Sequence, residues 1–252
     1  MMVRMLNKSD LIIPDWPAPS NVHAIQTTRQ GGFSDAPFES LNLGAHVQDH
    51  LITVVKNRQL LDQFVPAEPV WLNQVHGTNV IDAALSSCVQ DADASFTTQS
   101  NVVCVTMTAD CLPVLLCDKQ GTAVSAIHAG WRSLCDGVIE NAVLAMGLKA
   151  EDVLAWLGPA IGPDAFKVGA EVRQAFIEKD ANATQAFRPH ADKWLANLYL
   201  LATQRLNNVG IKAIYGGGDC TYSYPERYFS FRRDGMTGRM ATMIWLAKPS
   251  SD

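Results

Sequence analysis

The feature that most constrains the fold is the segment TADCLPVLLCDKQGTAVSAIHAGWR. It contains two short apolar runs, Leu112–Cys117 and Thr122–Ile127, joined by a polar connection that ends in a glycine. Runs of this length around a Gly-containing connection predict a β-hairpin. Cys111 precedes the first predicted strand and His128 follows the second. The hairpin therefore places a thiol and an imidazole at the same end of a sheet.

A second histidine fits the same pattern. His76 follows the apolar run Val70–Val75, which we expect to be another strand, and a glycine comes next. A Cys thiolate with two neutral imidazoles suits Zn²⁺, and a site with three protein ligands keeps one position open for catalysis. Asp110, beside Cys111, is a candidate for proton transfer. The long intervals between the three residues leave a second interpretation open, in which each is an ordinary core side chain.

Cys111 and His128 also support a rival hypothesis. A thiolate beside an imidazolium can act as nucleophile and general base without any metal. Such a hydrolase needs a third group that orients the histidine and donors that stabilise an oxyanion. The sequence offers no specific candidates for either.

Two arginines lie where an anion could bind. Arg29 precedes a Gly-Gly pair after a predicted strand, and adjacent glycines permit a turn with exposed backbone N–H groups. Arg132 precedes a predicted helix over 133–146, whose N-terminal dipole favours negative charge. The alternative for Arg29 is an ordinary turn with a solvated side chain.

The remaining pattern predicts an α+β fold with mixed sheets and one catalytic domain over residues 1–252. The Pro-rich residues 1–20 are expected to be extended and packed on the surface. His46 and His50 are expected to be surface histidines, and the acids of the polar segment 90–100 to be solvated or to cap a turn. We expect strands at 22–28, 70–75, 102–107, 153–157, 211–215, 228–233 and 239–246, and helices at 53–64, 133–146, 169–180 and 192–207.

Composition excludes several classes of protein. The formal net charge of −5 argues against a nucleic-acid binder, which usually carries a basic face. Six cysteines without a CxxC pair argue against a disulfide framework and for a reducing compartment. No uninterrupted apolar run is long enough to span a membrane, and the N-terminus lacks the apolar core of a signal peptide. We therefore expect a cytoplasmic protein without a membrane partner.

Several motifs together resemble a known family. WLNQVHG, TADCLPVLL, AIHAGWRS, LGPAIGP and YFSFRRDGMTGRM occur in the expected order, with TTRQGGFS before them and DCTYS ahead of the last. The chain is similar over residues 27–246 to the YfiH family, whose members are called purine nucleoside phosphorylases, laccase-domain proteins or polyphenol oxidases. The resemblance implies an α+β fold with mixed sheets, similar to a toxin catalytic domain. Gln48-Asp49-His50 and the run of three glycines at 216–218 depart from the family pattern.

The resemblance also implies a chemistry. The family's zinc ligands fall on His76, Cys111 and His128, and its activities imply phosphorolysis of adenosine, inosine and methylthioadenosine, together with deamination of adenosine. Purine nucleoside and phosphate are then the expected small-molecule partners. Candidates for phosphate binding are arginines, because a guanidinium matches the oxygens of phosphate, and Arg132 is preferred among Arg29, Arg132, Arg232, Arg233 and Arg239.

Copper is the alternative metal. Cu²⁺ binds most sites of nitrogen and sulfur more tightly than Zn²⁺, so it can enter a His₂Cys site by affinity alone. A laccase, however, needs a trinuclear copper cluster rich in histidine. Six scattered histidines do not supply one, so a copper-loaded phenol oxidase ranks behind the zinc enzyme.

Overall fold

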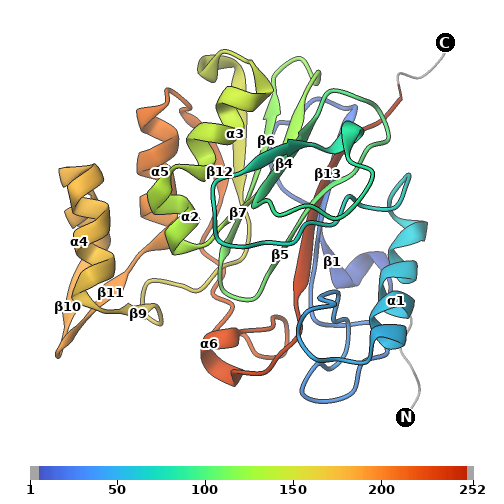
Figure 1. The fold of residues 1–252 in the computed structure, drawn as a ribbon, viewed down its shortest axis with the longest axis horizontal. Helices are drawn as coiled ribbons and strands as arrows, with labels where there is room; N and C mark the ends of the chain where they lie inside the picture. Colours follow the sequence, from blue (N-terminus) through green and yellow to red (C-terminus); the bar gives the residue numbers. More distant parts are fainter. Residues whose placement is uncertain (1–5, 249–252) are drawn as a thin grey trace.

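The computed structural model describes residues 6–248. Its centre is a mixed six-stranded sheet, and a four-stranded antiparallel sheet packs against it (Figure 1). The six strands, in spatial order, are β12 (Ala213–Gly216), β8 (Val153–Leu157), β6 (Leu112–Asp118), β7 (Val124–Ala129), β4 (Ala94–Thr97) and β3 (Val80–Asp82). The four strands are β1 (Leu11–Ile12), β2 (Val22–Thr27), β13 (Met240–Leu246) and β5 (Cys104–Thr108).

Helices cover the outer faces of both sheets. Figure 1 shows α2, α3, α4 and α5 on one side of the molecule and α1 on the other. A small third sheet extends the side that carries α4. The helices are α1 (Leu51–Gln59), α2 (Trp131–Asp136), α3 (Val138–Met146), α4 (Ala170–Lys179), α5 (Leu198–Asn208) and α6 (Phe231–Asp234). The third sheet orders β10 (Phe187–His190), β11 (Lys193–Ala196) and β9 (Lys167–Val168). Single 3₁₀ turns occupy Lys8–Asp10, Leu60–Gln63, Ala83–Leu85, Ala150–Asp152 and Ala181–Ala186.

The predicted hairpin is confirmed as β6 and β7 at the middle of the large sheet. Every residue of both strands is buried, because each face has a cover. Val114 and Leu116 pack toward the helices, whereas Leu115 and Cys117 pack toward the second sheet. Period-two alternation of the side chains sends neighbouring residues to opposite faces. The hairpin is therefore shared by the two main cores.

The mixed α+β class predicted from the pattern is confirmed, with several local corrections. Residues 192–207 are not one helix, because β11 pairs with β9 and β10 and α5 starts only after the Asn197 side chain accepts a hydrogen bond from the N–H of Leu200. The segment 228–233 is not a strand, because the Ser230 hydroxyl caps the short helix α6. The helix expected at 133–146 is two helices, since Gly137 takes a left-handed φ of 102° between them.

Within residues 6–248, no helix has both the length and the apolar character needed to cross a bilayer.

Candidate metal and substrate site

The structure brings His76, Cys111 and His128 together. One ligand atom from each lies within 4.8 Å of the others. The Cys111 Sγ is 3.8 Å from the His76 Nε2, and the two imidazole rings meet edge to face with centroids 4.8 Å apart. His128 is buried, Cys111 is partly buried and His76 is exposed. The cluster therefore lies at the surface end of the buried hairpin, where a substrate can reach it.

The hairpin register explains two of these positions. Cys111 immediately precedes β6, and His128 lies in β7 opposite Pro113 of β6. The position of His76 differs from the sequence expectation. The segment 70–75 forms only isolated bridges at Val70 and Asn73, so His76 does not end a strand. Its φ of 60° places it in a tight turn instead.

A buried carboxylate holds that turn and His128 together. Asp93 is 0% exposed, and its Oδ1 lies 2.7 Å from the Nδ1 of His128. The same carboxylate accepts hydrogen bonds from the backbone N–H groups of Val75, His76 and Gly77 at 3.2, 2.9 and 2.6 Å. A proton held on Nδ1 leaves Nε2 of His128 available as a metal ligand.

Asp93 was missed by the sequence reasoning, which expected the acids of this segment to be solvated or to cap a turn. The residue directly precedes β4, which pairs antiparallel with β7, and the His128 N–H donates to the Asp93 carbonyl at 2.7 Å. Only this pairing places the acid beside the histidine. A DxD sequence before a strand carries no such signal by itself.

Charges within the cluster favour a thiolate at Cys111. Burial alone raises the pKa of this thiol, but the positive charge and hydrogen bonds of His128 and His76 outweigh burial and lower it to about 6. Burial alone lowers the pKa of His128, whereas the Cys111 thiolate and Asp93 raise it to about 9. Burial in apolar surroundings raises the pKa of Cys104 to about 12. Cys111 is thus set apart as the thiol in its metal-binding and nucleophilic form.

The donor set fits a soft or borderline divalent metal. One thiolate and two imidazoles are the ligands that Zn²⁺ and Cu²⁺ accept, whereas Mg²⁺ and Ca²⁺ prefer oxygen. Gly130 leaves room for this cluster, because a Cβ atom there would lie 2.7 Å from His76 Cδ2 and 3.3 Å from the Cys111 Sγ. His76, Cys111 and His128 are therefore the residues that would hold such an ion.

A cavity of about 380 Å³ opens beside the cluster. All three candidate ligands line it. Its other walls are mainly apolar and aromatic, with a few polar side chains, which is the usual character of a small-molecule site. Apart from the three candidate ligands, the lining residues are His46, Gln74, Met107, Ala109, Asp110, Trp131, Ile161, Phe166, Leu198, Phe231, Arg232 and Arg239.

His46 is an exposed histidine, as expected, but it also lines the cavity. The loop after the first strands folds across the molecule, because the Leu43 N–H donates to the Arg239 carbonyl and Asn42 accepts from the Arg239 N–H. This contact carries His46 to the cavity wall.

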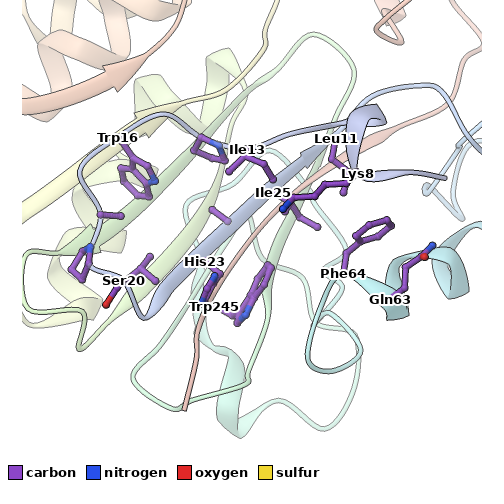
Figure 2. A pocket seen from close by; sticks show the side chains of 15 residues that line it. Lys8, Leu11, Ile13, Trp16, Ser20, His23, Ile25, Gln63, Phe64 and Trp245 are labelled. Atoms are coloured by element: carbon purple, nitrogen blue, oxygen red, sulfur yellow. The ribbon is translucent and has the colours of Figure 1, made fainter. Parts of the chain in front are cut away.

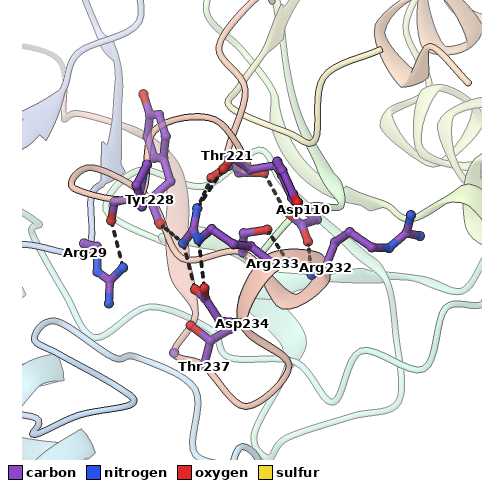
Figure 3. A network of polar contacts seen from close by, with 12 residues as sticks. Arg29, Asp110, Thr221, Tyr228, Arg232, Arg233, Asp234 and Thr237 are labelled. Carbon is purple, nitrogen blue, oxygen red and sulfur yellow. Dashed lines mark hydrogen bonds and ion pairs between the residues drawn. The ribbon is translucent and has the colours of Figure 1, made fainter. Parts of the chain in front are cut away.

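Asp110 lies in the wall with both carboxylate oxygens occupied. Thr221 donates its hydroxyl to Oδ1 and the backbone N–H of Arg232 donates to Oδ2, each at 2.6 Å (Figure 3). Asp110 has a φ of 100°, a conformation that is unusual for a non-glycine residue. The carboxylate therefore ties the segment before β6 to the loop that begins α6.

The predicted arginines separate into two groups. Arg232 and Arg239 line the cavity, and Arg232 donates to the Lys167 carbonyl and lies 5.3 Å from the Phe166 ring centroid. Arg132 is exposed over the Trp131 ring and does not line the cavity. The other two hold loops together: Arg29 donates to the carbonyls of residues 39 and 225, and Arg233 to those of residues 221, 222 and 228 and to Asp234.

A larger groove lies elsewhere, on the four-stranded sheet. It has a volume of about 620 Å³ and runs beneath the segment that contains Trp16, past the stacked rings of His23 and Trp245 (Figure 2). None of its lining residues belongs to the cluster or its cavity. The larger groove is therefore separate from the candidate metal site.

Comparisons with known proteins show the family of the chain. Residues 23–247 match the family described as multi-copper polyphenol oxidoreductase laccase. A purine nucleoside phosphorylase YfiH of Shigella flexneri is 54% identical, with 94% of this chain and 99% of the relative covered. A purine nucleoside phosphorylase of Haemophilus influenzae is 52% identical, with 93% and 98% covered.

Solved structures show the same fold. A protein of Neisseria meningitidis superposes with a TM-score of 0.93 at 47% identity, covering 95% of this chain and all of the other. YlmD of Geobacillus stearothermophilus gives 0.86 at 26% identity, with 98% and 99% covered. The matched region contains all three candidate ligands and the cavity beside them. The chain therefore belongs to the laccase-like polyphenol oxidoreductase family that includes the YfiH proteins.

Proposed function

We propose that the chain is a zinc-dependent purine nucleoside phosphorylase that also deaminates adenosine. The single observation that carries the proposal is the cluster of one thiolate and two imidazoles at the wall of a cavity large enough for a nucleoside. The names of the relatives support the substrate class, since they are purine nucleoside phosphorylases. The residues that line the cavity are spread through the sequence from His46 to Arg239. This spread supports a single catalytic domain that includes most of the chain.

Zinc is proposed as the metal held by His76, Cys111 and His128. When bound, it would supply a Lewis acid at one end of the cavity. The protein's part is to keep Cys111 as a thiolate and His128 in one tautomer, through the hydrogen bond to Asp93. Copper remains the alternative occupant, because the matched family is named for copper and the same donors accept it.

The residues of the cavity wall support a proposed place for each substrate group. Trp131, Phe166 and Phe231 offer flat apolar surfaces for a purine, and the guanidinium of Arg232 supplies positive charge nearby. Enclosing the base and the sugar excludes water and fixes the glycosidic bond relative to an attacking oxyanion.

Some expected roles stay predictions. Asp110 is retained as a proposed proton-transfer residue, although its two hydrogen bonds favour a role in positioning the Arg232 loop. Arg29, Arg132 and Arg233 are outside the cavity wall, so phosphate binding by them would require a contact that the cavity lining does not include. Arg232 and Arg239 are the predicted phosphate ligands that line the cavity.

A thiol hydrolase is the second candidate function. The observation that favours it is the pairing of a thiol whose pKa is about 6 with an imidazole whose pKa is about 9, which makes a thiolate and imidazolium at neutral pH without metal. Asp93 would be the group that orients the histidine.

Two measurements test the proposal. Metal analysis of the purified protein and its Cys111→Ala variant is expected to show zinc in the first and a loss in the second, and equal zinc in both rejects Cys111 as a ligand. Adenosine incubated with and without phosphate distinguishes the activities: adenine formed only with phosphate indicates phosphorolysis, and inosine indicates deamination. Turnover that survives chelation but not alkylation of Cys111 would instead support the thiol hydrolase.

A further inference from the structure

A second cavity adjoins the first. We call it the side chamber; it has a volume of about 320 Å³. It shares His46, Phe231 and Arg239 with the main cavity, so these three side chains form the boundary between the two spaces. The rest of its wall comes from Val47, Gln48, Gly235, Met236 and Thr237. Its location beside the proposed nucleoside cavity makes it a candidate for a second, smaller ligand.

Arg239 brings an unpaired positive charge to this boundary. Its side chain is partly buried, and its Nη1 donates only to the backbone carbonyls of Thr237 and Gly238, at 2.9 and 3.0 Å. Within residues 6–248, no carboxylate oxygen lies within 4.0 Å of its guanidinium, whereas Arg205 and Arg233 each have such a partner. The negative charges of Cys111 and Asp110 act on the guanidinium, but neither makes an ion pair or a hydrogen bond with it within residues 6–248, so its other N–H groups can donate to an anion.

Thr237 adds an unsatisfied donor. The residue is 1% exposed, and its hydroxyl has no hydrogen-bond partner in the described part of the chain. The backbone N–H groups of Met236, Thr237 and Gly238 likewise make no hydrogen bond to any residue between 6 and 248. Thr237 and Gly238 are buried whereas Met236 is exposed. Buried polar groups normally have partners, so the donors of Thr237 and Gly238 match the needs of an oxyanion.

We propose that the side chamber binds inorganic phosphate, the second substrate of the phosphorolysis, between Arg239, His46 and Thr237. This inference rests on the proposed function and adds to it a place for the nucleophile. The guanidinium of Arg239 and the hydroxyl of Thr237 donate to phosphate oxygens, while His46 closes the side toward the main cavity. Donors around a tetrahedral anion give both affinity and orientation.

The arrangement suits the balanced reaction. One oxygen of hydrogen phosphate forms the new bond to C1′ of the ribose, and the bond from C1′ to the purine nitrogen breaks. The electron pair leaves with the purine, which takes up the proton that hydrogen phosphate gives up. The products are ribose 1-phosphate and the free base, and no oxidant or further reactant is needed. Phosphate held at the boundary between two cavities lies beside a nucleoside in the larger one.

The test uses metal-loaded full-length protein and two measurements: binding of inorganic phosphate followed by ³¹P NMR, and the separate KM values for phosphate and adenosine. Arg239→Gln is expected to weaken phosphate binding and raise the KM for phosphate about tenfold to hundredfold, with the KM for adenosine changed less than about twofold. Deamination, which uses no phosphate, provides a separate readout of the metal and the nucleoside cavity. Arg188→Gln removes an exposed arginine that lines neither the main cavity nor the side chamber, and it is expected to behave like the wild type.

Two further variants guard against a simple folding defect, because Arg239 also holds its own loop. Arg239→Lys keeps the charge but loses the planar fork, so phosphate binding should fall between the wild type and Arg239→Gln. Thr237→Val keeps the side-chain volume but removes the hydroxyl, and it should weaken phosphate binding without affecting adenosine.

The possible results test the phosphate site in the side chamber separately from the proposed phosphorylase activity. If the wild type catalyses phosphorolysis and the folded variants Arg239→Gln and Thr237→Val keep the wild-type KM for phosphate, the side chamber is not the phosphate site. A rise in the KM for adenosine alone also overturns the proposed phosphate site, because the chamber would then hold part of the nucleoside. Phosphate binding that depends on Arg239 in a protein that does not cleave nucleosides would support the anion site and reject the phosphorylase.

Discussion

The Oδ1 of Asp93 lies 2.7 Å from the Nδ1 of His128, and both side chains are buried. The same carboxylate receives three backbone N–H groups of the turn that carries His76. One acid therefore fixes two of the three candidate metal ligands, although it touches neither the thiol nor the cavity. Carboxylates in this position orient a ligating histidine and raise its basicity.

Replacing Asp93 by Asn should weaken metal binding without removing a ligand. The neutral amide cannot accept from all the donors that surround the carboxylate, so the His128 ring loses its fixed tautomer. We expect the affinity for zinc to fall about 10- to 100-fold, measured by competition with a chromogenic chelator. Asp91→Asn is the matched control, because that exposed acid contacts Asn73 and not the cluster. Equal affinity in wild type and Asp93→Asn would show that the carboxylate does not tune the site.

Gly130→Ala should displace His76. The added Cβ would lie 2.7 Å from His76 Cδ2, closer than real Cβ contacts allow, and the exposed imidazole is the group that must move. We expect a folded protein by circular dichroism with a loss of bound metal. Gly77→Ala is the control, since its Cβ would meet Asp93 Oδ2 at 3.5 Å and Val75 Cγ2 at 3.6 Å, which are ordinary contact distances. Full metal content in Gly130→Ala would contradict the geometry of the cluster.

Thr221→Val should destabilise the protein through Asp110. The substitution keeps the shape but leaves the buried Oδ1 of Asp110 without the hydroxyl that donates to it at 2.6 Å. The expected loss in the free energy of unfolding is about 1–3 kcal/mol, measured by urea denaturation. Thr122→Val removes a similar bond to Asp118 from an exposed threonine and should cost less. A loss no larger than that control would show that the bond to Asp110 contributes little.

Adding zinc to metal-free protein should raise its melting temperature. A ligand that binds only the folded state at about 100 times its Kd adds about 2.7 kcal/mol. For a chain of this size that corresponds to roughly 5–10 °C in differential scanning calorimetry. Cys111→Ala should show little of this shift, whereas Cys88→Ala, which removes an exposed thiol outside the cluster, should keep it. The same shift in Cys111→Ala would indicate that zinc binds elsewhere.

Local patterns in the sequence predicted the parts of the fold that depend on neighbouring residues. The β6–β7 hairpin, the helix α4 and the last strand β13 follow from apolar runs and turn residues that lie close together in the chain. The prediction of a helix at 192–207 was wrong because contacts distant in the sequence decide its first part. That part is a strand, β11, which pairs with β9 and β10. Strand pairing with distant segments overrides helical periodicity.

In the candidate site, too, some features follow from the local sequence and others depend on contacts between distant segments. The sequence by itself determined the donor chemistry, one thiol and one imidazole at the end of a hairpin with a second imidazole upstream, because residue types and a local turn suffice for that. Only the tertiary structure decided that Asp93 contacts His128, that His46 reaches the cavity and that Arg239 makes no ion pair with any residue between 6 and 248. The contact between Asp93 and His128 joins residues 35 positions apart, so its free energy exists only once the sheets have packed.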